Sequence, residues 1–223
     1  MPVTQQQNLL VNADKNCQIC PRLAEFRAEA RQNHPDWHNG PVPVWGDSAG
    51  RLFIIGLAPG MKGANRTGRP FTGDFAGNLL FETLTRAGLS SGTYDQRPDD
   101  GFLLHGVLIA NAVRCVPPQN KPTGAEIANC RPFLLAALAA HPKAKTFLAL
   151  GRIAHESFIT SFGLRRASFP FGHGARHDLG ENRVLFDSYH CSRYNTNTRR
   201  LTAKMFEEVV FAAAQQAKIG RWR

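Results

Sequence analysis

The sequence predicts an α/β fold in which a central sheet of four parallel strands is covered by helices on both faces. Four short apolar runs alternate with helical segments along the chain, which is the pattern of consecutive βαβ units. Glycine-rich or polar segments follow the strands, as in proteins that bind ligands at the carboxyl edge of a parallel sheet. With 223 residues and 43% hydrophobic content, the chain suits one domain spanning residues 1–223.

The sequence pattern of the N-terminal segment predicts a helical arm. Residues 5–33 have apolar residues at helical spacing on both sides of a turn at Cys17 and Cys20, and Pro21 suits the first turn of the second helix. Residues 33–50 are rich in Pro, Gly, Asn and Asp, so we expect a loop there.

The first strand is expected over residues 52–57, an apolar run followed by a glycine-dense loop that extends to Gly77. Glycine lacks the Cβ that would keep a ligand away from the backbone, so the loop suits close contact with a ligand; a long surface loop is the alternative. The loop contains neither G-x-x-x-x-G-K-[ST] nor G-x-G-x-x-G, so a triphosphatase or a dinucleotide enzyme is not supported. A helix is expected over residues 75–89, with Asp74 at its N-cap.

The second strand is expected over residues 107–113, where Asn111 is the one polar residue. A buried amide needs hydrogen-bond partners, so Asn111 either bonds neighbouring backbone or points into a site at the carboxyl end of the strand. The second interpretation is favoured because a polar, proline-rich loop over residues 114–122 follows directly.

The remaining elements continue the alternation. They are a helix from Thr123 or Gly124 to about residue 140, a strand over 146–150, a helix over 152–162, a basic loop over 165–180, a strand over 184–187 and a helix over 197–217. The loops after the first, second and fourth strands contain Asp74, Asn111 and His190. Because the carboxyl ends of parallel strands lie at one edge of the sheet, we expect these three side chains to converge.

The charge balance indicates an acidic polymer as partner. The net charge is +10, and twenty of the 27 basic residues are Arg, which pairs bidentately with phosphate. Nucleic acid fits this balance best, and a charged surface that only keeps the protein soluble is the alternative. The sequence has no long apolar run and does not begin like a signal peptide, so we expect a cytoplasmic protein that binds no membrane.

The cysteines indicate a metal centre. Cys17 and Cys20 form C-x2-C, and Cys115 and Cys130 lie far along the chain with fourteen residues between them. Four thiolates from two distant segments suit either tetrahedral zinc or a [4Fe–4S] cluster, while scattered buried core cysteines are the alternative. Stabilising disulfides are a poor explanation, because thiols stay reduced inside cells. Cys191 is left over.

Five motifs resemble those of one enzyme family. They are GLAPG at 56–60, NRTGRPFTGD at 65–74, NAVRC at 111–115, PPQNKP at 117–122 and HCSRYN at 190–195. With the four cysteines, they resemble the bacterial and archaeal iron–sulfur uracil-DNA glycosylases, and within them the type 5 group, over about residues 17–204. The resemblance implies a three-layer α/β/α sandwich that acts as a monomer. It also implies an enzyme that flips uracil, or another deaminated base such as hypoxanthine, out of double-stranded DNA and hydrolyses the N-glycosidic bond.

The resemblance also implies the site residues. The expected catalytic residues are Asp74, Asn111 and His190. The expected substrate contacts are Gly56, Ala58, Phe71, Asn120, Arg193 and Tyr194. The expected phosphate contacts are Arg66, Arg69, Lys121, Arg199 and Arg200. The expected ligands of a [4Fe–4S] cluster, which ties in the N-terminal arm, are Cys17, Cys20, Cys115 and Cys130.

These roles follow from the chemistry of base excision. Phe71 would stack on the extruded base, Asn111 would donate to and accept from the base edge, and His190 would bond the carbonyl where negative charge develops. Asp74 would activate water or stabilise the cationic sugar, and Arg193 and Tyr194 would wedge into the gap left by the base. The alternatives are structural: Phe71 in the core, Asp74 as a helix cap and Tyr194 in packing.

One departure from the related type 4 enzymes bears on the chemistry. They have an acidic residue directly after the first glycine of GLAPG, where this chain has Leu57. Asp74 is therefore the candidate acid. The missing acid also leaves a second function open, a DNA-damage-binding module of the same fold that does not hydrolyse the bond.

Overall fold

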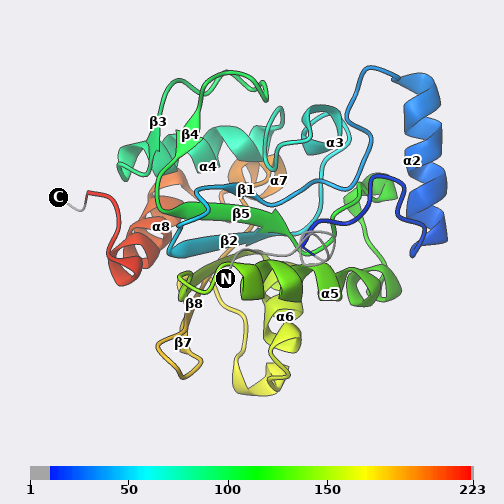
Figure 1. The fold of residues 1–223 in the computed structure, drawn as a ribbon. Coiled ribbons are helices and arrows are strands. Elements are labelled where there is room, and N and C mark those ends of the chain that lie inside the picture. Colours follow the sequence, from blue (N-terminus) through cyan, green and yellow to red (C-terminus); the bar gives the residue numbers. More distant parts are fainter. Residues whose placement is uncertain (1–10, 222–223) are drawn as a thin grey trace.

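The central sheet has six strands in the order β1-β5-β2-β6-β8-β7. The computed structural model describes residues 11–221 and has the predicted α/β architecture (Figure 1). The four inner strands are parallel and confirm the four predicted strands. They are β2 (Leu52–Gly56), β5 (Val107–Asn111), β6 (Thr146–Leu150) and β8 (Val184–Ser188).

Two short edge strands extend the sheet beyond the prediction. β1 (Trp45–Gly46) pairs antiparallel with β5, and β7 (Arg176–Asp178) pairs antiparallel with β8. The prediction of a four-stranded sheet is therefore wrong in strand number. Two or three paired residues leave no alternation to detect in segments rich in Gly, Pro or charge. A separate hairpin pairs β3 (Ser90–Ser91) with β4 (Leu103–Leu104).

The register of the parallel strands aligns their carboxyl ends. Gly56 at the end of β2 lies opposite Asn111 at the end of β5. Leu150 at the end of β6 lies opposite Ser188 at the end of β8. The loops that follow these strands therefore start from one edge of the sheet, which is where open α/β sheets bind their ligands.

Helices cover both faces of the sheet (Figure 1). The pair on one face is α4 (Phe75–Arg86) and α8 (Ala203–Ala217), and the pair on the other is α5 (Gly124–Ala140) and α6 (Arg152–Ser161). In β2, Leu52 and Ile54 belong to the core beneath the first pair, whereas Phe53 and Ile55 belong to the core beneath the second pair. Because successive strand side chains point to opposite faces, a continuous apolar run is what a doubly covered sheet requires.

Two helices begin at the caps that the sequence identifies. Thr123 Oγ1 accepts a hydrogen bond from Glu126 N at 3.2 Å, and Glu126 Oε2 accepts one from Thr123 N at 2.7 Å, so a capping box begins α5. Asp74 Oδ1 accepts a hydrogen bond from Gly77 N at 3.1 Å and caps α4. A cap of this kind stabilises a helix by about 0.5–2 kcal/mol.

The predicted helix over residues 197–217 is divided in two. A short helix, α7 (Arg193–Asn197), begins at its cap Ser192, and α8 begins after its own cap, Thr202. Between them Arg199 has a φ of 56°, a left-handed conformation that an α-helix interior does not contain. The division places α7 next to His190 as a separate unit.

The N-terminal arm agrees with the prediction in part. α2 (Pro21–Asn33) is helical as expected, whereas residues 12–20 form turns and bends. Residues 5–10, where a helix is also expected, lie outside the described residues. Figure 1 shows α2 standing apart from the sheet, and the Arg22 guanidinium joins it to α5 through Glu126 at 2.7 Å. No helix within residues 11–221 is long and apolar enough to cross a membrane.

Candidate active site

A cavity of about 580 Å³ lies at the carboxyl edge of the sheet. The loops that follow β2, β5 and β8 each contribute side chains to it, so Asp74, Asn111 and His190 line one cavity, as the topology predicts. The other predicted site residues that line it are Ala58, Phe71, Asn120, Arg193, Tyr194 and Arg200. The volume is in the range of small-molecule sites.

Asn111 presents an unsatisfied amide oxygen. The residue is 3% exposed, and its buried Oδ1 has no hydrogen-bond partner among the described residues. Gly56 lies opposite it in the sheet, where an added Cβ would clash with Asn111 Oδ1 and lie 2.7 Å from the ring of Phe71. A buried amide that the protein leaves unpaired is a site for a ligand with complementary polar atoms.

Phe71 and His190 present two aromatic rings to the cavity. Their ring centroids are 6.0 Å apart and their planes differ by 26°. Phe71 has a φ of 56°, a left-handed conformation that costs a non-glycine residue about 1–2 kcal/mol. The carbonyl oxygen of Phe71 accepts a hydrogen bond from the Tyr94 hydroxyl at 3.3 Å, which helps to hold this conformation. Strain of this kind occurs at sites where a side chain is held for a ligand.

His190 is neutral at physiological pH. Burial lowers its pKa to about 4, because the cationic form loses hydration in the cavity wall. Its ring makes no hydrogen bond to the described part of the chain, while its carbonyl oxygen accepts one from Asn195 Nδ2 at 2.8 Å. The backbone is therefore fixed, and one ring N–H remains available to a ligand.

Asp74 caps α4 and also lines the cavity, so its structural and chemical roles do not exclude each other. Burial raises the pKa of Asp74, and backbone hydrogen bonds from Gly77 and Ala76 offset part of that rise. The second carboxylate oxygen, Oδ2, lies where a Cβ on Gly63 would be only 2.6 Å away. The glycine of the loop thus makes room for the carboxylate.

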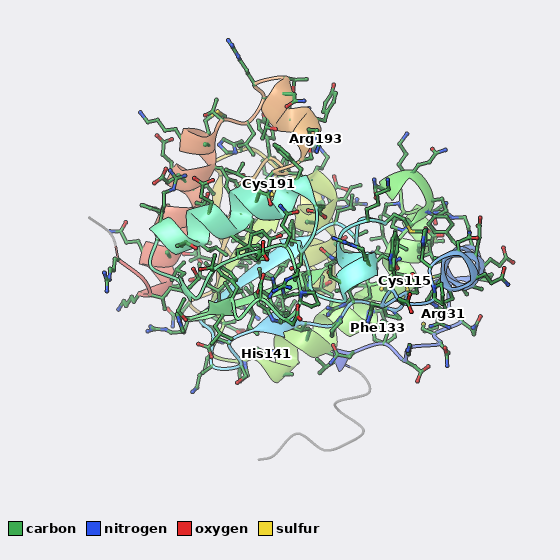
Figure 2. All side chains as sticks on the ribbon, turned by 90° about the horizontal axis from the view of Figure 1, so that it is seen from above. Arg31, Cys115, Phe133, His141, Cys191 and Arg193 are labelled. Atoms are coloured by element: carbon green, nitrogen blue, oxygen red, sulfur yellow. The ribbon has the colours of Figure 1, made fainter. Side chains whose placement is uncertain are left out.

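The short helix α7 forms one rim of the cavity. Figure 2 shows Arg193 on α7 at the outer edge of the molecule. The Arg193 guanidinium lies 5.2 Å from the centroid of the Phe75 ring, and Tyr194 is 72% exposed. Tyr194 is the most exposed large hydrophobic side chain of the described residues, and its place at the cavity rim suits contact with a partner.

Four of the five predicted phosphate contacts are exposed: Arg66, Lys121, Arg199 and Arg200. Arg69 is not, because it is 4% exposed and donates to both carboxylate oxygens of Asp100, at 2.8 and 2.7 Å. Its guanidinium also lies 4.9 Å from the Trp45 ring centroid. Although burial opposes it, the Arg69 hydrogen bonds hold the pKa of Asp100 well below its usual range. The prediction that Arg69 contacts phosphate is therefore wrong, because its charge is used within the fold.

The four predicted ligand cysteines line a second, small cavity between α2 and the loop after β5. Cys115, labelled in Figure 2 beside α2, accepts a hydrogen bond from Arg27 Nη1 at 3.4 Å, and Cys130 Sγ accepts one from Arg114 N at 3.2 Å. Burial raises the pKa of the Cys115 thiol to about 12 and that of Cys130 to about 11. Thiols so buried need a cation to become thiolates.

The sulfur spacing is wider than one zinc ion requires, and a buried cation lies beside the cysteines. All four are described, and no three of their sulfur atoms lie within 4.8 Å of one another. Ligands of one tetrahedral zinc ion, with Zn–S bonds of about 2.3 Å, would lie about 3.8 Å apart. The guanidinium of Arg114 is buried beside Cys130 without a hydrogen-bond partner among the described residues, and burial lowers its pKa to about 10. A buried cation suits the negative charge of a thiolate-bound cluster.

Cys191 belongs to a different environment. It is fully buried, lies away from the cavity that the other four cysteines line, and is labelled apart from Cys115 in Figure 2. Burial, and to a lesser extent the nearby Asp74 carboxylate, raise the pKa of its thiol far above the usual value. Such a thiol is a core group.

Sequence reasoning misses two residues that build the site. Ser192 caps α7, with its Oγ 3.4 Å from Asn195 N, and Asn195 Nδ2 holds the His190 carbonyl. Both also line the main cavity. The signal available was their place in the HCSRYN motif, where Ser192 directly before a helical segment favours an N-cap.

Comparison with known proteins identifies relatives. The family model described as the uracil DNA glycosylase superfamily matches residues 43–214. A type-5 uracil-DNA glycosylase of Thermus thermophilus is 46% identical over 207 residues, covering 90% of this chain and 94% of the relative. A type-5 uracil-DNA glycosylase of Pyrobaculum aerophilum is 40% identical over 212 residues, covering 93% and 92%. A type-4 uracil-DNA glycosylase of the same organism is 33% identical over 152 residues, covering 68% and 63%.

Proposed function

Because this chain belongs to the uracil DNA glycosylase superfamily, and within it to the type 5 group, we propose that it removes uracil from DNA by hydrolysing the N-glycosidic bond. The observation that carries the proposal is the unpaired amide of Asn111 in a cavity that also presents Phe71 and His190. Such a cavity can hold one flipped base between an aromatic ring, an amide edge and a neutral imidazole.

Asn111 selects the base in this proposal. Its amide oxygen can accept from the N3–H of uracil while its NH2 group donates to the O4 carbonyl. Cytosine presents the opposite pattern at these two positions, an acceptor at N3 and a donor at N4. A site with buried polar groups discriminates strongly, because the wrong partner leaves those groups unpaired. The absence of any protein partner for Asn111 Oδ1 among the described residues supports this role.

His190 stabilises the leaving base. As the glycosidic bond breaks, negative charge develops on the uracil O2 oxygen, and a neutral imidazole donates its N–H there without gaining a proton. A preorganised donor of this kind contributes roughly 10²–10³ in rate. The low pKa of His190, about 4, supports a role as neutral donor rather than as general acid.

Asp74 completes the reaction on the sugar side. As a carboxylate it holds the attacking water or stabilises the cationic sugar. With Leu57 in the place of an acid, Asp74 is the single carboxylate lining the cavity among residues 11–221. The apolar Leu57 side chain also imposes no hydrogen-bond requirement, so we propose that deaminated purines such as hypoxanthine are accepted beside uracil.

The exposed basic residues bind the phosphates of duplex DNA in this proposal, and α7 enters the DNA double helix. Arg66, Lys121, Arg199 and Arg200 are exposed and suit phosphate contacts. The exposed Tyr194 suits insertion into the gap that the flipped nucleotide leaves.

A [4Fe–4S] cluster held by Cys17, Cys20, Cys115 and Cys130 is the proposed cofactor. When bound, it supplies a structural cross-link and takes no part in the bond cleavage. These residues join the segment before α2 to the loop after β5 and to α5, so the cluster closes a long loop of the chain.

A strand-cleavage assay tests the proposed activity. The protein is incubated with a duplex containing one uracil, and abasic sites are then cleaved with alkali; a duplex with thymine at the same position is the control. We expect cleavage of the uracil strand alone. If the protein binds the uracil duplex but cleavage does not exceed that of the protein-free reaction, the chain is a damage-binding module and the proposal fails.

A further inference from the structure

Three side chains outside the cavity form a buried hydrogen-bonded network. His155 on α6, Asp187 on β8 and His177 on β7 have side chains that are 1%, 0% and 10% exposed. His155 Nδ1 lies 2.7 Å from Asp187 Oδ1, and His177 Nε2 lies 3.0 Å from Asp187 Oδ2. The second ring nitrogen of His155, Nε2, lies 2.8 Å from the carbonyl oxygen of Phe169.

The two hydrogen bonds of the His155 ring need two hydrogens. A neutral imidazole paired with an ionised carboxylate supplies only one. The Phe169 carbonyl only accepts, so His155 Nε2 must carry a hydrogen. If Asp187 is ionised, Nδ1 must carry a second hydrogen and His155 is a cation. If His155 is neutral, Nδ1 has a lone pair and Asp187 must be protonated. Two lone pairs facing each other at 2.7 Å without a proton would be repulsive, so the pair holds one shared proton in either case.

A divalent metal ion fits these distances less well. The three side chains offer ligand atoms that lie within 4.8 Å of one another. Two ligands of one tetrahedral zinc ion, with bonds of about 2.0–2.1 Å, would lie about 3.3 Å apart. The 2.7 Å separation of His155 Nδ1 and Asp187 Oδ1 is that of a direct, charge-assisted hydrogen bond.

The network fastens the strand that leads to His190. Asp187 lies three residues before His190, and its backbone N–H and C=O bond Ala175 and Gly174 at 3.0 and 2.8 Å. The segment attached in this way carries His173, whose Nδ1 accepts from Tyr189 N at 3.2 Å and whose ring stacks on Tyr189. Tyr189 directly precedes His190, so a short series of contacts connects the network to the loop that contains His190.

We propose that His155, Asp187 and His177 are positioning residues that hold the His190 loop through a proton shared between His155 and Asp187. The proposal rests on the proposed glycosylase reaction for its kinetic consequence, while the shared proton is independent of it. The neighbouring charged groups have other partners: Glu156 on α6 pairs with Arg166 at 2.9 Å, and Arg176 on β7 donates to Gln216 at 3.3 Å. His173 bonds Tyr189, and Arg152 lies over the Phe171 ring at 5.3 Å.

The first test is spectroscopic and does not depend on activity. The full-length protein is labelled with ¹⁵N-histidine, and its proton spectrum is recorded in water at neutral pH. We expect a far-downfield proton resonance assigned to the His155–Asp187 bond by its loss in His155→Gln and in Asp187→Asn. Absence of such a resonance in the wild type overturns the proposal, as does stoichiometric zinc whose removal changes the His155 signals.

Asp187→Asn offers a sharp kinetic comparison. Its amide N–H can donate to His155 Nδ1 while its oxygen accepts from His177 Nε2, so both hydrogen bonds persist without the additional proton. Single-turnover rates at saturating protein are measured for this variant, for Asp187→Ala and for Ser161→Ala. Ser161 is a buried α6 residue whose hydroxyl bonds the Ser157 carbonyl outside the network, so Ser161→Ala is the control.

We expect Asp187→Ala to slow the chemical step by up to about 10²-fold with unchanged DNA affinity, the loss that a misplacement of about 1 Å can cause. Asp187→Asn and Ser161→Ala should stay close to the wild type at neutral pH. A folded Asp187→Ala variant with the wild-type rate overturns the proposal. If that variant does not fold, a folded His155→Ala variant with the wild-type rate overturns it.

Discussion

Asp74 combines a structural contact with a proposed chemical one, and two substitutions separate them. Asn is as good an N-cap as Asp, so Asp74→Asn should retain the melting temperature while slowing single-turnover uracil release by about 10²-fold. Asp74→Ala should lose the same rate and, in addition, about 1 kcal/mol of stability with the cap of α4. The measurements are single-turnover rates and thermal unfolding. If Asp74→Asn releases uracil at the wild-type rate, the carboxylate is only a cap.

The pH dependence of the rate reports His190. Its pKa is lowered to about 4 by burial, and the pKa of Asp74 is raised by burial above its usual value. The reactive form has neutral His190 and ionised Asp74. The rate should therefore be high at neutral pH and fall as the pH drops and these two groups become protonated. In Asp74→Asn the remaining acid limb should lie near pH 4. A loss near pH 6.5, the ordinary value for histidine, would show that His190 is not buried as described.

At the scale of elements, the proposed cluster would tie α2 to the loop after β5 and to α5 through its four cysteines. Purified wild-type protein should be brown, with broad visible absorbance. Cys115→Ser should lose the colour and unfold at a lower temperature, because the N-terminal segment is no longer cross-linked. Cys191→Ala is the matched control, a buried cysteine outside the cysteine cavity, and should keep the colour. A colourless wild-type protein that contains zinc would contradict the cluster.

The elements that the sequence predicts well are those whose signal is local. β6 could be placed at its observed bounds because Thr146 and four apolar residues form a short run that Gly151 ends. The start of α5 could be placed because Thr123 suits an N-cap. The edge strands β1 and β7 have two and three residues, and their pairing is imposed by the neighbouring strand. The break between α7 and α8 depends on Arg199, which adopts a left-handed backbone conformation. Because this residue is not glycine, the sequence does not indicate the break.

At the scale of the whole molecule, the basic surface should make DNA binding strongly salt-dependent. Arg200 is exposed and lines the cavity, so Arg200→Ala should lower the slope of log affinity against log salt by about one unit. Titration of a fluorescent duplex at several salt concentrations measures this slope. An unchanged slope in Arg200→Ala would remove that residue from the DNA-binding surface.

Arg69 is the matched control, since it has the same charge but is buried. Arg69→Ala should leave the salt slope unchanged and destabilise the fold by about 3–5 kcal/mol, because it leaves Asp100 buried without its partner. Denaturant unfolding measures the loss of stability. A reduced salt slope in a folded Arg69→Ala variant would contradict its internal role.

The site was predictable where topology alone decides. Asn111 ends β5, Asp74 and His190 lie in the loops after β2 and β8, and parallel pairing brings the ends of these strands together. Arg69 was not predictable, because its partner Asp100 returns to it through the hairpin of β3 and β4, a contact with no sequence signature. The His155–Asp187 pair, separated by 32 residues, also could not be predicted, because its contact has no sequence signature.

We propose that the residues around Asn111 and His190 catalyse hydrolysis of the bond between uracil and its sugar. The most direct measurement is the release of free uracil from a duplex under single-turnover conditions, detected by mass spectrometry for the wild type, Asn111→Ala and His190→Ala. We expect uracil release by the wild type and a rate about 10²-fold lower in His190→Ala, with duplex affinity retained. Asn111→Ala should lose more rate on uracil than on hypoxanthine. The contradicting result is a wild-type protein that binds the duplex and releases no uracil, or a His190→Ala variant that releases it at the wild-type rate.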